Sequence, residues 1–238
     1  MKYMVRVFSI LLILFLLVGF TIPAVALNTG FSTEEMSEAD ANHAIAVTSL
    51  SLLTEEPQLL YMTGFDVNET KIAIEQNGYD TQKTISVYSH DGQFLYGYAF
   101  ESMGSYGVEW DGDNLNIYFV RGGLIISVDP TGKIIDVKDV PDTSENDAYY
   151  RNSMEATERS VDGITYTIKK ERRFAPYYYL LQATDQNGQI RILFECDPPA
   201  DSSSTFFPFI AIWMVGGAGV TAIWIVGLRI LRRHLKKK

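Results

Sequence analysis

Two apolar segments, one at each end of the chain, set the strongest limit on what this sequence can fold into. The first follows two basic residues, runs from Val7 to Phe20 and ends in a small-residue site at Ala24 and Ala26. A basic start, an apolar stretch and a small-x-small site in this order are typical of a secretory signal peptide. We therefore predict export with removal of residues 1–26, with an uncleaved signal anchor as the alternative.

The second apolar segment runs from Phe206 to Leu228 and contains no charged residue. A helix of this length covers about 34 Å, which is enough to cross the hydrocarbon core of a bilayer. The basic stretch Arg229–Lys238 follows directly and is typical of a cytoplasmic stop-transfer flank. We predict a polar linker at 198–205, a single transmembrane helix at 206–228 and a cytoplasmic tail at 229–238. The bulk of the chain then lies outside the cell membrane.

Small residues gather on one part of the predicted span. Helices approach each other closely where small residues recur at spacings of four. The residues that fit this spacing, and that we predict as helix–helix contacts, are Gly217, Ala218, Thr221 and Ala222. They raise the hypothesis that the chain is a subunit of a complex assembled in the membrane.

The region between the two apolar segments is strongly acidic. All 29 acidic residues lie between Glu34 and Asp201, with only 12 of the 20 basic residues, which gives this region a net charge of −17. Phosphate contacts require Lys and Arg, so we exclude nucleic acid as a partner. The single cysteine, Cys196, has no internal disulfide partner and lies in an apolar run, where a buried thiol is expected.

A change of pattern divides the exported region in two. In residues 27–57, Ser32 stands three residues before Glu35, which is the spacing of a helix capping box. We predict a helix from there towards Leu53, with Pro57 beyond it. From 58 to 197 the sequence changes to short alternating apolar runs broken by Asp, Asn and Gly, which predicts antiparallel strands.

Three units can be aligned within residues 58–197. Each has two strands joined by a turn, a loop, and two further strands joined by a glycine turn. The first turns lie at Asp66, Asp111 and Asp162, and the glycines of the last turns are Gly92, Gly132 and Gly188. A four-stranded meander that recurs at this period resembles a β-propeller blade. Three units are fewer than a usual closed propeller has, so an open stack, a barrel-like sheet and part of an assembly remain open.

No pattern for catalysis, a cofactor or a metal ion is present in the sequence. His90 precedes a glycine turn, so we interpret it as an exposed turn residue. Asp111-Gly112-Asp113-Asn114 lacks the further ligands of a calcium loop, so a β-turn is expected there. At least six aspartates in or beside turns are expected to bond their own backbone, namely Asp66, Asp91, Asp111, Asp129, Asp162 and Asp185. Four glutamates remain as candidates for acid–base chemistry: Glu75, Glu101, Glu109 and Glu155.

One basic cluster and a run of tyrosines are the candidate partner contacts. The basic cluster lies in a long hairpin of the third unit and would suit an anionic polymer, and tyrosine rings stack on sugars or peptides. The residues are Lys169, Lys170, Arg172, Arg173, Tyr177 and Tyr178. We predict a membrane-anchored, non-enzymatic module that binds a protein or an envelope polymer. The alternatives are a subunit of a membrane complex and a hydrolase of the cell envelope.

Overall fold

The computed structural model describes residues 27–58, 61–77, 81–170 and 177–196. The predicted signal peptide, the polar linker, the transmembrane segment and the basic tail lie outside the described residues. Among the residues that the structure describes, no helix combines the length and the apolar character needed to cross a membrane.

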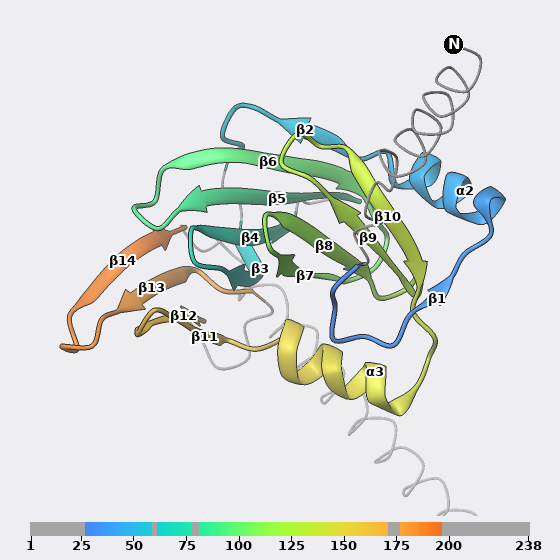
Figure 1. Ribbon diagram of the computed structural model, residues 1–238. Helices are drawn as coiled ribbons and strands as arrows, with labels where there is room; N and C mark the ends of the chain where they lie inside the picture. The colour runs from blue at the N-terminus through green and yellow to red at the C-terminus, as the bar shows by residue number, and fades with distance from the viewer. Residues whose placement is uncertain (1–26, 59–60, 78–80, 171–176, 197–238) are drawn as a thin grey trace, which may run out of the picture. The chain divides into compact units, whose positions relative to one another are not determined.

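Three antiparallel sheets form the fold, which confirms the all-β prediction (Figure 1). Sheet A has the order β1 (Glu34–Glu35), β10 (Ile134–Asp139), β9 (Leu124–Val128), β8 (Asn114–Phe119) and β7 (Tyr106–Asp111). Sheet B has the order β2 (Ser51–Leu53), β6 (Phe94–Glu101), β5 (Gln82–Ser89), β4 (Lys71–Asn77) and β3 (Tyr61–Val67). Sheet C has the order β11 (Glu158–Val161), β12 (Ile164–Lys169), β13 (Leu180–Thr184) and β14 (Ile190–Glu195).

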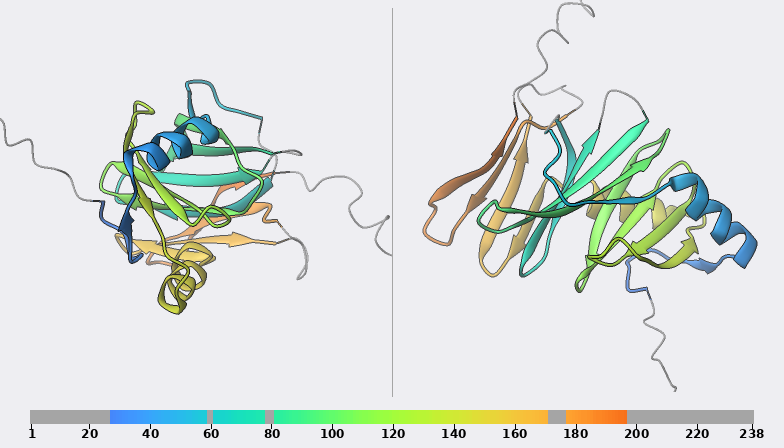
Figure 2. Two further views of the ribbon diagram at one scale, coloured as in Figure 1. Left: turned by 90° about the vertical axis from the view of Figure 1, so that its right-hand side faces the viewer. Right: turned by 90° about the horizontal axis from the view of Figure 1, so that it is seen from above.

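Sheet B lies between sheets A and C, and both of its faces are buried (Figure 2). Successive side chains of a strand point to opposite faces. On β4, Ala73 therefore packs into the core shared with sheet A, while Ile72 and Ile74 pack into the core shared with sheet C. This two-sided burial explains why β4 is a continuous apolar run rather than an alternating one.

The same hairpin turn joins the last two strands of every sheet. The amide of Gly92, Gly132 or Gly188 donates to the carbonyl three residues earlier, at Ser89, Asp129 or Asp185 respectively. All three glycines have φ near +80°, which residues with a Cβ rarely adopt. In the second and third turns the Asp side chain also accepts backbone amides two and four residues ahead, as the sequence predicts.

The N-terminal segment differs from the prediction. The helix α2 begins later, at Glu38, and ends at Thr48, with Ser37 rather than Ser32 as its cap. Ser32 instead takes part in long-range contacts, since its amide donates to Asn146 Oδ1 at 2.8 Å. Residues 34–35 and 51–53 then pair as β1 with β10 and as β2 with β6. Pairing with distant strands therefore overrides the local capping signal.

A helical segment connects sheet A to sheet C. It consists of α3 (Ser144–Tyr149) and a wider π-helical turn, η1 (Tyr150–Met154). Thr143 caps α3 by accepting the amide of Asn146. The segment runs beside β7 and β3 (Figure 1). Its Tyr150 ring lies 5.5 Å from the Tyr118 ring of β8, and its Tyr149 hydroxyl donates to Glu109 of β7.

Candidate functional site

Buried polar side chains gather where β3, β4, β7 and η1 meet. Two hollows lie side by side there, and both are bordered by Met154 and Ala156 of the helical segment and the loop after it. We call the first, of about 400 Å³, the junction cavity, and the second, of about 420 Å³, the arginine hollow. The junction cavity is the more polar of the two hollows. The titratable side chains that line it are Glu75, Tyr106, Tyr150, Glu155, Lys170 and Tyr178.

Glu75 is the most deeply buried carboxyl group of the junction cavity, with 3% of its surface exposed. Its Oε1 accepts the amide of Val108 at 3.0 Å. Gly64 gives it room, since a Cβ at that position would lie 2.7 Å from the Glu75 carboxyl carbon. Burial raises the pKa of Glu75 to about 8, with only partial compensation by the bond from Val108. At neutral pH the group is therefore mostly a neutral acid that can donate a proton or a hydrogen bond.

Tyr106 connects β7 to sheet B beside Glu75. Its hydroxyl accepts the amide of Gln76 at 2.9 Å and lies within bonding distance of the carbonyls of Gln76 and Thr84. Asn77, on the same cavity wall, has a buried side-chain oxygen without a hydrogen-bond partner among the described residues. A buried side-chain oxygen without a partner is rare in folded proteins.

The arginine hollow is organised by a partly buried ion pair. Arg159 Nε lies 2.9 Å from Asp66 Oδ1, and Asp66 Oδ2 accepts the amide of Trp110 at 2.9 Å. Arg159 also donates to the carbonyl of Ser153, which ties β11 to η1. Burial raises the pKa of Asp66 even against the opposing effect of Arg159. Asp66 lies beside the turn after β3, as predicted, but it is a strand residue whose carboxyl group also bonds two distant segments.

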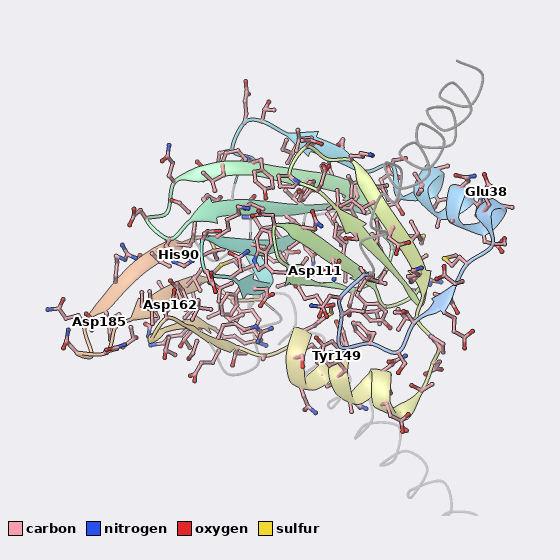
Figure 3. All side chains as sticks on the ribbon, viewed as in Figure 1. Glu38, His90, Asp111, Tyr149, Asp162 and Asp185 are labelled. Carbon is pink, nitrogen blue, oxygen red and sulfur yellow. The ribbon has the colours of Figure 1, made fainter. Side chains whose placement is uncertain are left out.

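Glu109 is the second carboxyl group of the arginine hollow. Its Oε2 accepts the Tyr149 hydroxyl at 2.5 Å, and its Oε1 accepts the Asn116 amide at 3.4 Å; Tyr149 is labelled in Figure 3. Burial raises the pKa of Glu109, and the hydrogen bonds oppose that rise. A carboxyl group with a raised pKa, aromatic rings and one guanidinium thus lie together in the arginine hollow. These groups can hydrogen-bond the hydroxyl and amide groups of a ligand. Among the described residues, no group of three or more His, Cys, Asp or Glu is arranged to hold a metal ion.

The predicted partner contacts are divided by the fold. Lys170 and Tyr178 line the junction cavity, and the Lys170 Nζ lies 4.8 Å from the centre of the Tyr178 ring. Tyr177 is buried against Tyr61, and Lys169 is exposed at the end of β12. The remaining predicted contacts lie outside the described residues, namely Arg172, Arg173, Gly217, Ala218, Thr221 and Ala222.

The four glutamates kept as acid–base candidates are also divided. Glu75 and Glu155 line the junction cavity, Glu109 lines the arginine hollow, and Glu101 lies at a separate groove beneath α2. Arg159 was not predicted as a site residue, and the contacts of Asp66 with distant segments were not predicted either. The signal that was available is Glu75 itself, because it directly follows the apolar run Ile72-Ala73-Ile74 and alternates with Ala73, which places its carboxyl group on a buried face of the strand.

Three smaller predictions can be compared with the structure. His90 is half-buried rather than exposed, since its Nε2 lies 2.9 Å from the Asn68 carbonyl and its Nδ1 lies 3.2 Å from the Tyr166 hydroxyl. It therefore joins sheet B to sheet C. The stretch after Asp111 forms the predicted turn, with Gly112 at φ +60°. Cys196 is buried, as expected.

The comparisons with known proteins leave the family open. No protein family matches the chain, and no curated protein matches it. Among solved structures, the chain is similar to a Bacteroides fragilis protein provisionally described as exported, with 12% identity and a TM-score of 0.26. The similarity covers 65% of this chain and 44% of that protein, so the chain spans less than half of its length. A likeness at this level carries no functional argument.

Proposed function

We propose that this chain is an extracytoplasmic module, held by a single membrane span, that binds a small hydroxyl-rich ligand at the junction of its sheets. The ligand class is a saccharide unit of an envelope polymer. The observation that carries this proposal is the convergence of Glu75 from sheet B, Tyr106 from sheet A and Lys170 from the loop after β12 on one cavity of about 400 Å³. Pockets of this size with a few converging polar groups are typical of small-molecule sites.

The chemistry of the two hollows supports a saccharide. Sugars present hydroxyl groups that both donate and accept, and apolar ring faces that stack on aromatic side chains. The neutral Glu75 carboxyl can donate, and the rings of Tyr150 and Tyr178 line the same cavity. Lys170 adds one positive charge, which favours a ligand that carries a carboxylate or phosphate. We propose further that the three sheets are blade-like repeats, which is supported by their shared hairpin turn.

A binding measurement tests this function. The intact chain, reconstituted in nanodiscs, is applied to an array of oligosaccharides prepared from bacterial envelope polymers, and each hit is titrated calorimetrically. E75A and K170A should weaken a genuine hit about tenfold or more, because each removes a hydrogen-bonding side chain from the cavity. E145Q, at an exposed position on α3, is the matched control and should bind as the unmodified chain does. Hits that survive both cavity variants would contradict the proposal.

An envelope hydrolase is the second candidate function. The observation that favours it is the presence of Glu75 and Glu155 in one cavity, with Glu75 protonated at neutral pH as a general acid must be. The same oligosaccharides are incubated with the chain and analysed for products by mass spectrometry. Turnover that E75Q abolishes would establish the hydrolase, and binding without turnover supports the module. The complex-subunit alternative depends on residues 217–222, outside the described part of the chain.

A further inference from the structure

A groove of about 900 Å³ lies beneath α2, away from the two junction hollows. Its lining comes from α2, from the segment after β6 and from the turn between β8 and β9. The apolar side chains that line it are Met36, Ala44, Val47, Met103, Phe119 and Leu124. Apolar side chains at the surface are ordinary when scattered, but here six of them line one groove.

α2 is held at both ends and packs on the core through Ala41, Ala44 and Ile45, so that the groove lies beside this contact. β1 before it pairs with β10, and β2 after it pairs with β6. Among the residues of α2 itself only Thr48 is buried. Val47 and Met103 remain 61% and 79% exposed, so apolar surface that a seated helix would cover stays accessible to a ligand.

The rim of the groove is mainly acidic. It carries four carboxylates, namely Glu35, Asp40, Glu101 and Asp139, against His43 and Arg121. Glu35 is already paired with Lys138 at 2.5 Å, and Asp40 accepts the Ser37 hydroxyl. Glu101 and Asp139 have no ion-pair partner among the described residues. The exported region also carries a net charge of −17, which attracts cations to the groove.

We infer that this groove binds an amphiphile with an aliphatic chain and a cationic ammonium head group. The chain lies against the apolar floor formed by Val47, Phe119 and Leu124, where removal of its methylene groups from water favours binding. The ammonium group lies at the rim, towards Glu101 and Asp139. A fatty acid of the same length is disfavoured, because its carboxylate would meet the same acids. This site is independent of the saccharide site at the junction.

Photolabelling of the intact chain in nanodiscs tests the inference. The probe is a dodecylammonium with a diazirine in its chain, and the matched probe is the corresponding diazirine fatty acid. Labelled residues are mapped by mass spectrometry. We expect the amine probe to label peptides containing Val47 or Met103, with labelling that unlabelled dodecylammonium suppresses. Both probes also enter the lipid of the nanodisc. The inference is overturned if only the lipid is labelled, or if the two probes label the groove equally.

Two variants separate the head-group contact from the apolar contact. E101Q/D139N should reduce labelling by the amine about fivefold, since it removes two charges from the rim, and should leave labelling by the fatty acid equal or greater. V47D places a charge on the floor and should suppress labelling by both probes. E145Q/D147N, on the exposed surface of α3, is the charge-matched control and should label normally. A control that loses labelling as strongly as E101Q/D139N would show a general charge effect and overturn the assignment.

Discussion

The junction of the sheets and the groove beneath α2 are hollows of opposite construction. The junction is enclosed by strands from three sheets, and its polar groups are fixed by partners such as the Asp66–Arg159 pair. The groove is covered by one helix held at its ends, and its lining is mainly apolar. Buried polar groups require partners, whereas apolar surface does not. The junction should therefore tolerate little change, and the groove should tolerate much.

The largest expected effect is at the ion pair of the junction. Replacing Arg159 by alanine leaves Asp66 buried without its counterion, so we expect a loss of about 3–5 kcal/mol in the free energy of unfolding. R151A is the matched control, because Arg151 pairs with Asp147 on the exposed surface of α3 and should cost at most about 0.5 kcal/mol. Urea unfolding followed by Trp110 fluorescence in a W213F/W224F background measures both. Equal losses in the free energy of unfolding for R159A and R151A would refute the expected difference between the buried and the exposed ion pair.

A second effect concerns pH and is spread over several pH units. Folding raises the pKa of Glu75 from 4.5 to about 8, so the native state keeps a proton that the unfolded chain releases. This contribution to stability is complete below about pH 4.5 and declines as the pH rises towards about 8, by at most about 1.4 kcal/mol per pH unit. E75Q should make the decline less steep over this range. Unfolding curves at several pH values test this, and an unchanged slope in a folded E75Q variant would exclude Glu75 as the source.

The smallest effect is expected at the groove. Ser37 caps α2 by accepting the amide of Asp40, and S37A should lower the free energy of unfolding by about 1 kcal/mol. S37N keeps an acceptor at the cap and should restore most of the loss. Hydrogen exchange of the α2 amides should accelerate in S37A while the amides of β4 keep their protection. Faster exchange throughout β4 would instead show that α2 stabilises the core, which would contradict the expected tolerance of the groove to change.

The fold was predictable where signals are local. Alternating apolar runs and glycine turns predict antiparallel strands, and the turns at Gly92, Gly132 and Gly188 repeat one hairpin geometry. The start of α2 was predicted wrongly, because Ser32 has the right local spacing but bonds Asn146, 114 residues away. Local spacing carries no information about such partners.

The candidate site was less predictable for the same reason. Asp66 and Arg159 are 93 residues apart, and His90 and Tyr166 are 76 residues apart. An aspartate near a turn gives the same sequence signal whether its carboxyl group bonds the turn or is buried between sheets. Only the packing of the sheets distinguishes the two cases. Lys170 and Tyr178 were chosen for their chemistry, and the fold brings both to the junction cavity.

The first residues after the expected cleavage site bond strands that lie much later in the chain. Asn28 bonds Asp111 and Asn116, and β1 pairs with residues of β10 that lie more than 100 positions later. The segment comes first in the chain, but its partners lie in β7, β8 and β10, so its contacts can form only once those strands are in place. A tag joined directly to Leu27 would lie beside these contacts. The N-terminal end of the described domain is thus a part of the fold that closes sheet A, and not a spacer.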